Sequence, residues 1–307
     1  MHSIGGPQLR VASSGGRYRL SLKSGASSDC RMTRRLLIVD GDVSCHLACK
    51  TRWQDKAKNN VVYIHLDENG NKLPLEFTTE EDERYFDASW NNFENSLKED
   101  MEATWCDSYI MAMKSDLNFR DDLYCDYKLS RKNVQATKLR NLFVPAVRGK
   151  AVIEGMAVRA VGREADDLVR IWAEQCMVAG IDFVVCSNDK DLKCIPGKHY
   201  NPKKRDGVTY VTEEEGIRHF YEQLLKGDPT DQIPGLPGVG NVYAKKFLAG
   251  HSTEEEFQEE VVSRYIDAFG NDWYSTLLIN GKLLHIQRTV NDYFCFDNWP
   301  VVKELTC

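Results

Sequence analysis

Long hydrophobic runs are absent from this sequence, and its cysteines follow no recognisable spacing. The longest apolar stretches, such as LLIV at 36–39, are only as long as a strand, whereas a membrane-spanning helix needs ~20 apolar residues. The ten cysteines include no CxxC pair and no spacing typical of zinc sites or disulfide frameworks. We therefore expect a cytoplasmic protein that does not contact membranes and whose thiols are reduced and mostly buried.

Histidine and net positive charge are also scarce. The chain has seven histidines and a formal net charge of −6, and His46, His199 and His285 share no metal-ligand spacing. The net charge is compatible with a polyanionic partner only if the acids gather in one pocket and the basic residues lie along another surface. With 307 residues, the chain is long enough for one large domain or two smaller ones.

Residues 1–33 differ in composition from the rest of the chain. The first 31 residues contain seven serines and five glycines and have hardly any apolar periodicity. We expect a disordered leader, which is either a transit peptide or sequence upstream of a start at Met32. The second interpretation is favoured because MTRRLLIVDGD would begin a domain directly with its first strand.

Apolar runs alternate with helical segments from residue 35 onwards. The predicted strands are 35–40, 61–66, 108–116 and 182–189, and the predicted helices are 80–104 and 164–179. This alternation is typical of an α/β fold with a mostly parallel, doubly wound sheet. DENGNK at 67–72 predicts a hairpin that makes 61–66 part of a local insertion. Residues 117–150 are rich in Lys and Arg without periodicity, and we interpret them as a mobile basic excursion from the sheet.

After about residue 201 the pattern predicts helices only. Thr212 with Glu215 and Ser252 with Glu255 form capping boxes that begin two of these helices. Between them lies the loop GDPTDQIPGLPGVG at 227–240, followed by a short helix.

Carboxylates follow the predicted strands. Asp40, Asp116, Asp189 and Asp191 end or follow three of them, and the carboxyl ends of parallel strands line one crevice. EADD at 164–167 adds three acids at a helix start. Each acid alone is explained by a turn or a helix dipole, but the set would repel itself unless cations neutralised it. Oxygen ligands with few histidines favour Mg²⁺ or Mn²⁺, which leads to the hypothesis of a two-metal centre for phosphoryl chemistry.

The loop at 227–240 has two interpretations. It could be a plain surface turn. Alternatively, Asp228 and Asp231 could reach the same metals, while the backbone N–H groups of GLPGVG offer a seat for phosphate. Lys245 and Lys246 would then extend this seat with positive charge.

Five separated motifs occur in the order and roughly the spacing of the 5′-nuclease (flap endonuclease) superfamily, which this chain resembles. They are LLIVDGD, FRDDLYCDYKLSRK, EADD, SNDKD and GDPTDQIPGLPGVG. DASW at 87–90 and the tail RTVNDYFCFDNW are similar to the podovirus 5′-to-3′ exonucleases of the phage branch. The resemblance implies a PIN-like (Rossmann-like) catalytic domain over 34–205 with a basic arch at about 117–150. It implies a helix-three-turn-helix DNA-binding and C-terminal helical region over 206–307.

The resemblance also implies roles for individual residues. The first metal site would consist of Asp40, Asp116, Glu164, Asp166 and Asp167, and the second of Asp189, Asp191, Asp228 and Asp231. The residues that would contact the scissile phosphate are Lys128 and Arg131. The residues that would bind DNA are Lys132, Gly235, Gly238, Gly240, Lys245 and Lys246, with a K⁺ ion held by loop carbonyls.

The activity implied is metal-dependent 5′-to-3′ exonuclease cleavage of double-stranded DNA, releasing mononucleotides or short oligonucleotides. Two Mg²⁺ ions would serve it, and Mn²⁺ could substitute. Its context would be phage DNA replication, recombination or host DNA degradation, in the host cytoplasm. The partners would be DNA with 5′ ends, nicks or flaps and RNA–DNA hybrids, acted on by a monomer. A flap endonuclease or RNase H that removes primers is the alternative within the superfamily.

Some features depart from the superfamily or fit other classes. Val242 stands where relatives often place a lysine, the insertion around 54–79 has no counterpart, and a metal role for Asp42 is left open. Asp40 and Asp42 also match the two aspartates of the DxDx[TV] signature of a haloacid-dehalogenase-like phosphatase, as nucleophile and acid. A DNA-end binder that does not cut is the third class considered.

Overall fold

The computed structural model describes residues 10–14, 17–21, 34–49, 77, 79–132 and 137–306. The predicted strand at 61–66, the predicted hairpin and almost all of the insertion around 54–79 lie outside these residues. Within the segment 1–33, β1 (Arg10–Ser14) and β2 (Arg17–Ser21) form an antiparallel pair.

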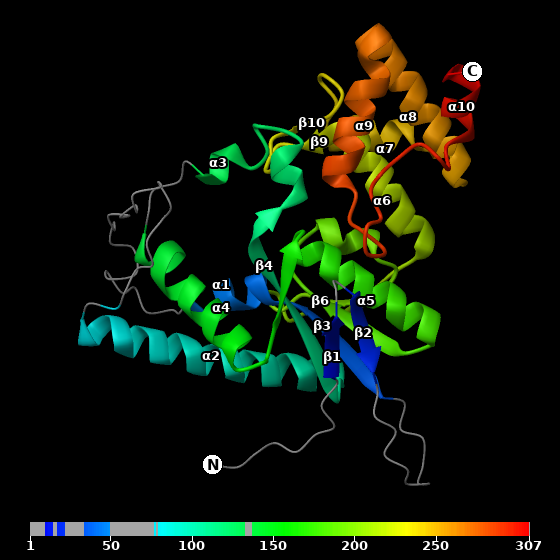
Figure 1. The fold of residues 1–307 in the computed structure, drawn as a ribbon. Helices are drawn as coiled ribbons and strands as arrows, with labels where there is room; N and C mark the ends of the chain where they lie inside the picture. Colours follow the sequence, from blue (N-terminus) through cyan, green and yellow to red (C-terminus); the bar gives the residue numbers. More distant parts are fainter. Residues whose placement is uncertain are drawn as a thin grey trace. The chain divides into compact units, whose positions relative to one another are not determined.

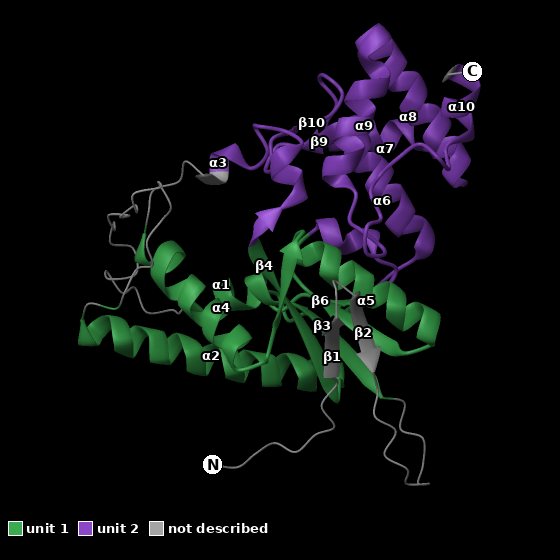
Figure 2. Ribbon diagram, viewed as in Figure 1, with its two compact units in different colours: residues 1–115, 134–189, 198–209 green, residues 116–133, 190–197, 210–307 purple. Residues whose placement is uncertain are grey.

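The chain forms two compact units (Figure 2). The first comprises residues 1–115, 134–189 and 198–209, and the second comprises residues 116–133, 190–197 and 210–307. The first half of the expected arch therefore groups with the C-terminal helices and not with the sheet.

A six-stranded sheet forms the centre of the first unit (Figure 1), in the order β5-β4-β3-β6-β7-β8. β3 runs parallel to both β4 and β6, and β6 runs parallel to β7. The predicted α/β fold with a mostly parallel sheet is thereby confirmed. The strands are β3 (Arg35–Asp40), β4 (Ser108–Asn118), β5 (Val158–Gly162), β6 (Asp182–Cys186), β7 (Gly197–Tyr200) and β8 (Val208–Val211).

Helices cover both faces of this sheet. Leu37 and Val39 of β3 belong to a core cluster shared with α1, α2 and α4, which pack on one another. Leu36 and Ile38 point to the opposite face because side chains alternate along a strand, and α5 packs against β3, β5 and β6. The helices are α1 (Gly41–Cys49), α2 (Glu80–Thr104), α4 (Val144–Ile153) and α5 (Ala165–Ala179).

The second unit is built mainly of helices around an aromatic-rich core. Tyr221, Phe257 and Tyr265 are buried in it, and so is Tyr127 from the segment before α3. The helices are α3 (Leu129–Lys132), α6 (Glu213–Lys226), α7 (Asn241–Phe247), α8 (Glu254–Phe269), α9 (Trp273–Leu284) and α10 (Pro300–Thr306). None of the helices in the described part of the chain combines the length and apolar character that a membrane span requires.

Three expectations need correction. β5, β7 and β8 were not predicted, and β8 lies after residue 201, where only helices were expected. The segment 117–150 is more regular than expected, because the apolar side of α4 is buried although basic residues dominate the segment. The capping box of α8 lies one residue later than predicted, at Thr253 and Glu256, whose backbone and side chain bond reciprocally.

The cysteines are mostly as predicted. All eight cysteines in the described residues are free thiols, and five of them are buried. Burial raises the pKa of the Cys49 thiol to about 11 and that of Cys176 to about 12. These thiols are therefore protonated, inert parts of the core.

Candidate active site

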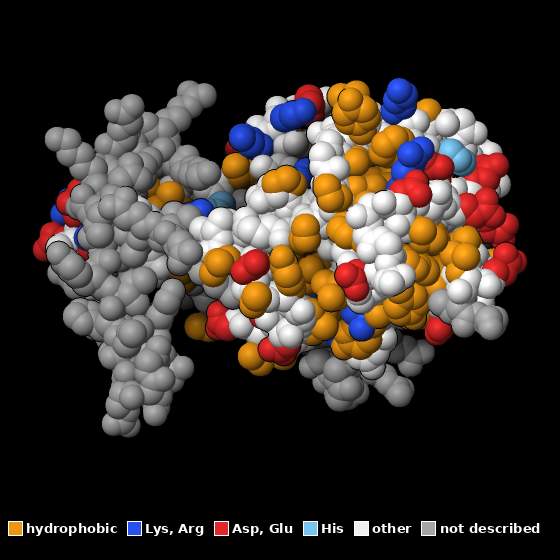
Figure 3. Space-filling model, turned by 90° about the horizontal axis from the view of Figure 1, so that it is seen from above, with side chains coloured by type: hydrophobic (Ala, Val, Ile, Leu, Met, Phe, Trp, Pro, Cys, Tyr) orange, Lys and Arg blue, Asp and Glu red, His pale blue; other side chains and the backbone are white. Residues whose placement is uncertain are grey.

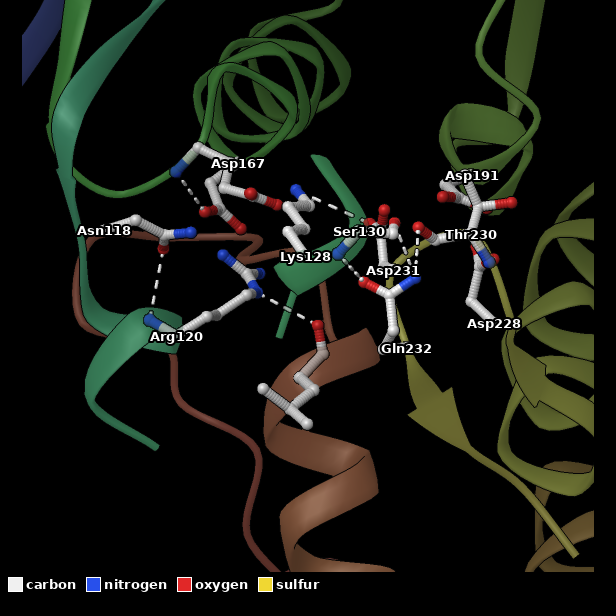
Figure 4. A network of polar contacts seen from close by, with 12 residues as sticks. Asn118, Arg120, Lys128, Ser130, Asp167, Asp191, Asp228, Thr230, Asp231 and Gln232 are labelled. Carbon is white, nitrogen blue, oxygen red and sulfur yellow. Dashed lines mark hydrogen bonds and ion pairs between the residues drawn. The ribbon is translucent and has the colours of Figure 1, made fainter. Parts of the chain in front are cut away.

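Three aspartates of the second unit converge on one point. Carboxylate oxygens of Asp191, Asp228 and Asp231 all lie within 4.8 Å of one another. Asp228 and Asp231 are buried, and Asp191 is half-buried. Figure 4 shows the three side chains with the polar groups around them. Three carboxylates at this spacing are the kind of oxygen-rich set that holds Mg²⁺ or Mn²⁺, so the structure brings together three of the four acids expected in the second metal site.

A tight two-stranded turn presents two of these aspartates. β9 (Gly227–Asp228) pairs antiparallel with β10 (Ile233–Pro234). Inside the turn, Asp228 accepts a hydrogen bond from the Thr230 backbone N–H at 2.8 Å, and the Asp231 N–H donates to the Asp228 carbonyl. Asp191 comes from elsewhere, at the start of a 3₁₀ turn at Asp191–Cys194.

The glycines of the adjoining loop differ in what they require. A Cβ at Gly235 would overlap the backbone of Lys226 and Gly227, so this glycine is needed for the close approach of the loop to the end of α6. Gly238 has φ +74° and Gly240 has open space around it. Of the three glycines expected to bind DNA, Gly235 thus has a packing role that is sufficient to explain it.

Two lysines offset part of the charge of the aspartate cluster. Lys190 Nζ lies 3.1 Å from Asp228 and Lys128 Nζ lies 3.4 Å from Asp231. Burial opposes ionisation of Asp228, but the Thr230 backbone N–H and Lys190 hold the pKa of its carboxyl below the usual range. The Gln223 amide donates to Asp191 at 2.8 Å. Asp228 is therefore ionised, and hydrogen bonds hold the carboxylates of Asp191 and Asp228 in place.

A second acidic group lies in the first unit at the end of β3. Asp40 is buried, and Ser187 Oγ donates to its carboxylate at 2.8 Å. Burial, followed by the neighbouring charges of Asp42 and Asp189, raises the pKa of Asp40 to about 7. The Asp189 N–H donates to the same Ser187 hydroxyl at 3.0 Å. Asp189, expected in the second metal site, is thus linked to Asp40 of the first.

Asp42 makes its bonds within the protein. Arg148 contacts its Oδ1 through Nη2 at 2.6 Å and Nε at 2.7 Å, while the Lys114 N–H donates to Oδ2 at 2.7 Å. The carboxylate ties α1 to β4 and α4. Neither a metal ligand nor the general acid of the phosphatase alternative is suggested by this arrangement.

The remaining acids of the first predicted site have varied surroundings. Asp167 is fully buried and accepts a hydrogen bond from the Glu164 N–H at 2.9 Å, capping α5. Asp166 is half-buried in the first turn of the same helix, and Asp116 is exposed near the end of β4. Helix capping therefore explains Asp167 at least in part.

The basic residues also divide into different classes. The ammonium group of Lys138, in the expected arch, forms a half-buried ion pair with both carboxylate oxygens of buried Asp82, at 2.8 and 2.9 Å. Lys245 and Lys246 are exposed on α7, as a DNA contact requires. Arg131 and Lys132 belong to α3, but their side chains lie outside the described part of the chain. Val242, in place of a relative's lysine, is 78% exposed.

The sequence did not reveal several residues that shape the second unit. Arg120 is buried, with Nε donating to the Leu283 carbonyl at 3.0 Å and Nη2 to the His285 carbonyl. It thereby fastens the start of the arch segment to the end of α9. Its position among exposed charged residues gave no sign of burial, because its partners are more than 160 positions away. Lys190 and Gln223 were not identified either, because their partners Asp228 and Asp191 lie on other elements, 38 and 32 positions away.

Positive charge gathers around His219 on α6. Burial, followed by the charges of Lys226, Lys193, Lys190 and Lys245, lowers the pKa of this imidazole to about 4. Its Nε2 has no hydrogen-bond partner among the described residues. Figure 3 shows that charge on the visible face is uneven, with the largest group of acidic side chains at one edge. The net charge of −6 therefore conceals a local concentration of lysines.

Comparison with known proteins identifies relatives of this chain. A family model described as the 5′-3′ exonuclease, N-terminal resolvase-like domain matches residues 78–221. DNA polymerase I of Rhizobium leguminosarum is 28% identical over 167 residues, which are 52% of this chain and 16% of the polymerase. The flap endonuclease Xni of Shewanella sediminis is 29% identical over 141 residues, covering 43% of this chain and 54% of Xni. The chain thus matches only part of the length of each relative.

Solved structures share the fold at low sequence identity. The T5 D15 protein, co-crystallised with metal ions, has a TM-score of 0.56 and 15% identity, with 84% of this chain and 90% of that chain covered. The T5 5′-exonuclease with zinc ions bound gives a TM-score of 0.55 at 15% identity, covering 82% and 86% of the two chains. These likenesses confirm the PIN-like sheet with a helical C-terminal region.

Proposed function

Because this chain belongs to the 5′-nuclease superfamily, we propose that it is a metal-dependent nuclease that hydrolyses DNA phosphodiesters from 5′ ends. The observation that carries the proposal is the convergence of Asp191, Asp228 and Asp231 with Lys128 at 3.4 Å from the last of them. Carboxylates that gather a cation and a lysine that neutralises phosphate are the two elements such hydrolysis requires.

The acids fit divalent cations by charge and donor type. We assign one Mg²⁺ to Asp191, Asp228 and Asp231, and a second to the group around Asp40 and Asp189, with Mn²⁺ able to replace either. Such ions supply a bound water of lowered pKa and stabilise the leaving oxygen. The raised pKa of Asp40 supports this assignment, since a buried carboxyl that also repels its acidic neighbours gains most from a nearby cation.

The protein's own residues have separate tasks. Lys128 offsets charge on the phosphate under attack, and Arg131 in α3 assists it. Lys245 and Lys246, exposed on α7, hold the duplex backbone beside Gly238 and Gly240. With Val242 in place of a lysine, this grip begins one turn later along α7.

The substrate we favour is double-stranded DNA with a 5′ end, cut by an exonuclease that releases mononucleotides or short oligonucleotides. Flap cleavage is the alternative within the family, and the likeness to the Xni flap endonuclease supports it. Both activities use the same acids and differ in the products.

One gel tests the proposal and separates these activities. Blunt, nicked, flapped and RNA–DNA substrates labelled at the 5′ end would be incubated with Mg²⁺, Mn²⁺ or EDTA. We expect mononucleotides or short oligonucleotides with either metal and none in EDTA, whereas flap-length products would favour the alternative. Asp228→Asn should slow cleavage roughly a hundredfold or more, and Asp267→Asn, at an exposed position of α8, is the matched control. Cleavage that survives EDTA or Asp228→Asn would refute the metal assignment.

A further inference from the structure

Two turns with left-handed backbone conformations meet beside the aspartate cluster. Lys128 has φ 55° and Gln232 has φ 57°, a region that side chains other than Asn, Asp and Gly seldom adopt. The Lys128 N–H donates to the Asp231 carbonyl at 3.0 Å. Both turns belong to the second unit, and Figure 4 shows them side by side.

The Gln232 side chain joins the two turns. Its Oε1 accepts from the Ser130 N–H at 3.0 Å, and its Nε2 donates to the Ser130 hydroxyl at 2.8 Å. The same Nε2 lies 3.1 Å from the carbonyls of Pro229 and Thr230, in its own turn. The bonds within its own turn fix the rotamer of Gln232, and the two bonds to Ser130, which we call the Gln232 clasp, tie this turn to a residue two positions after Lys128.

Lys128 depends on this arrangement for its direction. Its ammonium lies over the Tyr127 ring at 4.8 Å and reaches Asp231 at 3.4 Å, while Tyr127 itself is buried in the core of the second unit. The ring fixes one side of the lysine turn and the Gln232 clasp fixes the other. A lysine held at both sides loses less entropy when it acts on a phosphate.

We propose that Gln232 is a positioning residue, which clasps Ser130 so that Lys128 stays directed at the rim of the carboxylate cluster. This inference rests on the proposed nuclease function. Gln232 does not touch the reacting atoms and acts only through Lys128. If Gln232 were merely structural, its substitution would lower kcat equally with and without Lys128. If it acted through Asp231 and the metal, its substitution would weaken Mn²⁺ binding.

The chain offers a substitution that separates the side chain from the backbone. Gln232→Asn keeps an amide and suits the left-handed conformation better than glutamine, but it is one methylene too short to clasp Ser130. A residue needed only for its backbone conformation would tolerate this change. Ser130→Ala removes the hydroxyl partner of Gln232 and leaves the N–H partner. We therefore expect it to lower kcat less than Gln232→Asn does.

Hydrogen exchange of the metal-free protein tests the clasp itself. We expect the Ser130 amide to exchange roughly tenfold faster in Gln232→Asn than in the wild type, while the urea midpoint stays the same or rises. Unchanged exchange at Ser130 would overturn the proposal. This arm does not depend on the protein being a nuclease.

Kinetics test the link to Lys128. On the DNA substrate, we expect Gln232→Asn to lower kcat roughly tenfold, with KM and the Mn²⁺ Kd changed less than twofold. In a Lys128→Met background, the same change should alter kcat less than twofold, since its effect acts through the lysine. Equal losses in both backgrounds, or a weakened Mn²⁺ Kd, would overturn the proposal. A wild-type protein that cleaves no DNA with Mg²⁺ or Mn²⁺ would instead count against the proposed function.

Discussion

Asp40 and Asp42 stand two residues apart and have opposite surroundings. Asp40 is buried with a pKa raised to about 7, first by burial and then by its acidic neighbours, whereas Asp42 is fixed by Arg148. The position of Asp40 at the end of β3 follows from the sequence, because the apolar run 36–39 predicts a buried strand and Asp40 is the first polar residue after it. The partner of Asp42 does not follow, because Arg148 lies 106 residues away and only the folded chain brings it near.

The ion pair between Asp42 and Arg148 should contribute strongly to stability. We expect Arg148→Met to lower the free energy of unfolding by about 2–4 kcal/mol, because Asp42 would keep a largely buried charge without its cation. Adding Asp42→Asn should restore at least half of the loss. Urea unfolding at pH 7 measures both, with Arg84→Met on the exposed side of α2 as a control that changes stability by less than about 0.5 kcal/mol. A double variant no more stable than the single one would contradict this explanation.

His219 should make stability depend on pH below neutrality. Burial and four nearby lysines lower the pKa of its imidazole from 6.5 to about 4 in the folded protein. Between these values only the unfolded chain takes up the proton, so stability falls as pH falls from 6.5 towards 4. We expect His219→Gln to remove roughly 2–3 kcal/mol of this change, measured by urea unfolding at several pH values. The same slope in both proteins would rule out His219 as its source.

At the scale of elements, the sequence predicts helices and strands better than it predicts the tertiary contacts between them. The periodicities of β3, α2 and α5 were read correctly because burial on one side imposes a fixed spacing. The basic segment was read less well. The ammonium of Lys138, within the segment interpreted as a basic excursion, is paired with buried Asp82, and Arg120 is buried against α9. Basic side chains can lie in contact with solvent, DNA or an acid, and composition alone does not distinguish these.

The β9–β10 turn makes a prediction about two glycines of one loop. Gly235→Ala places a methyl group against backbone atoms of Lys226 and Gly227, which cannot move without opening the turn that carries Asp228 and Asp231. We expect it to cost about 3 kcal/mol or more and to weaken Mn²⁺ binding.

Gly238→Ala is the matched comparison for Gly235→Ala. This glycine has φ +74° and open space around it, so the change should cost only about 1 kcal/mol and leave the Mn²⁺ affinity unchanged. Calorimetric titration with Mn²⁺ and urea unfolding measure both variants. Equal effects of the two substitutions would contradict the packing role assigned to Gly235.

At the scale of the whole molecule, charge is distributed unevenly. The chain carries a net charge of −6, yet four lysines, among them Lys245 of α7, surround His219, and Lys246 is exposed beside Lys245 on the same helix. The sequence predicted the mostly parallel fold and all three acids of the cluster, Asp191, Asp228 and Asp231, because motifs in order restrict topology. It could not predict the lysines that balance those acids, since charge compensation depends on distances between elements far apart in the chain.

DNA affinity should therefore come from a local patch and depend steeply on salt. Each phosphate contact contributes about 0.9 to the slope of log K against log salt for duplex DNA. We expect Lys245→Met with Lys246→Met to reduce that slope by roughly 1–2 in fluorescence anisotropy with Ca²⁺ in place of Mg²⁺. Lys203→Met with Lys204→Met, also exposed but in the first unit, should change it by less than about 0.5. If the two double substitutions lowered the slope equally, the net charge of the protein would govern binding and α7 would not be the DNA-binding surface.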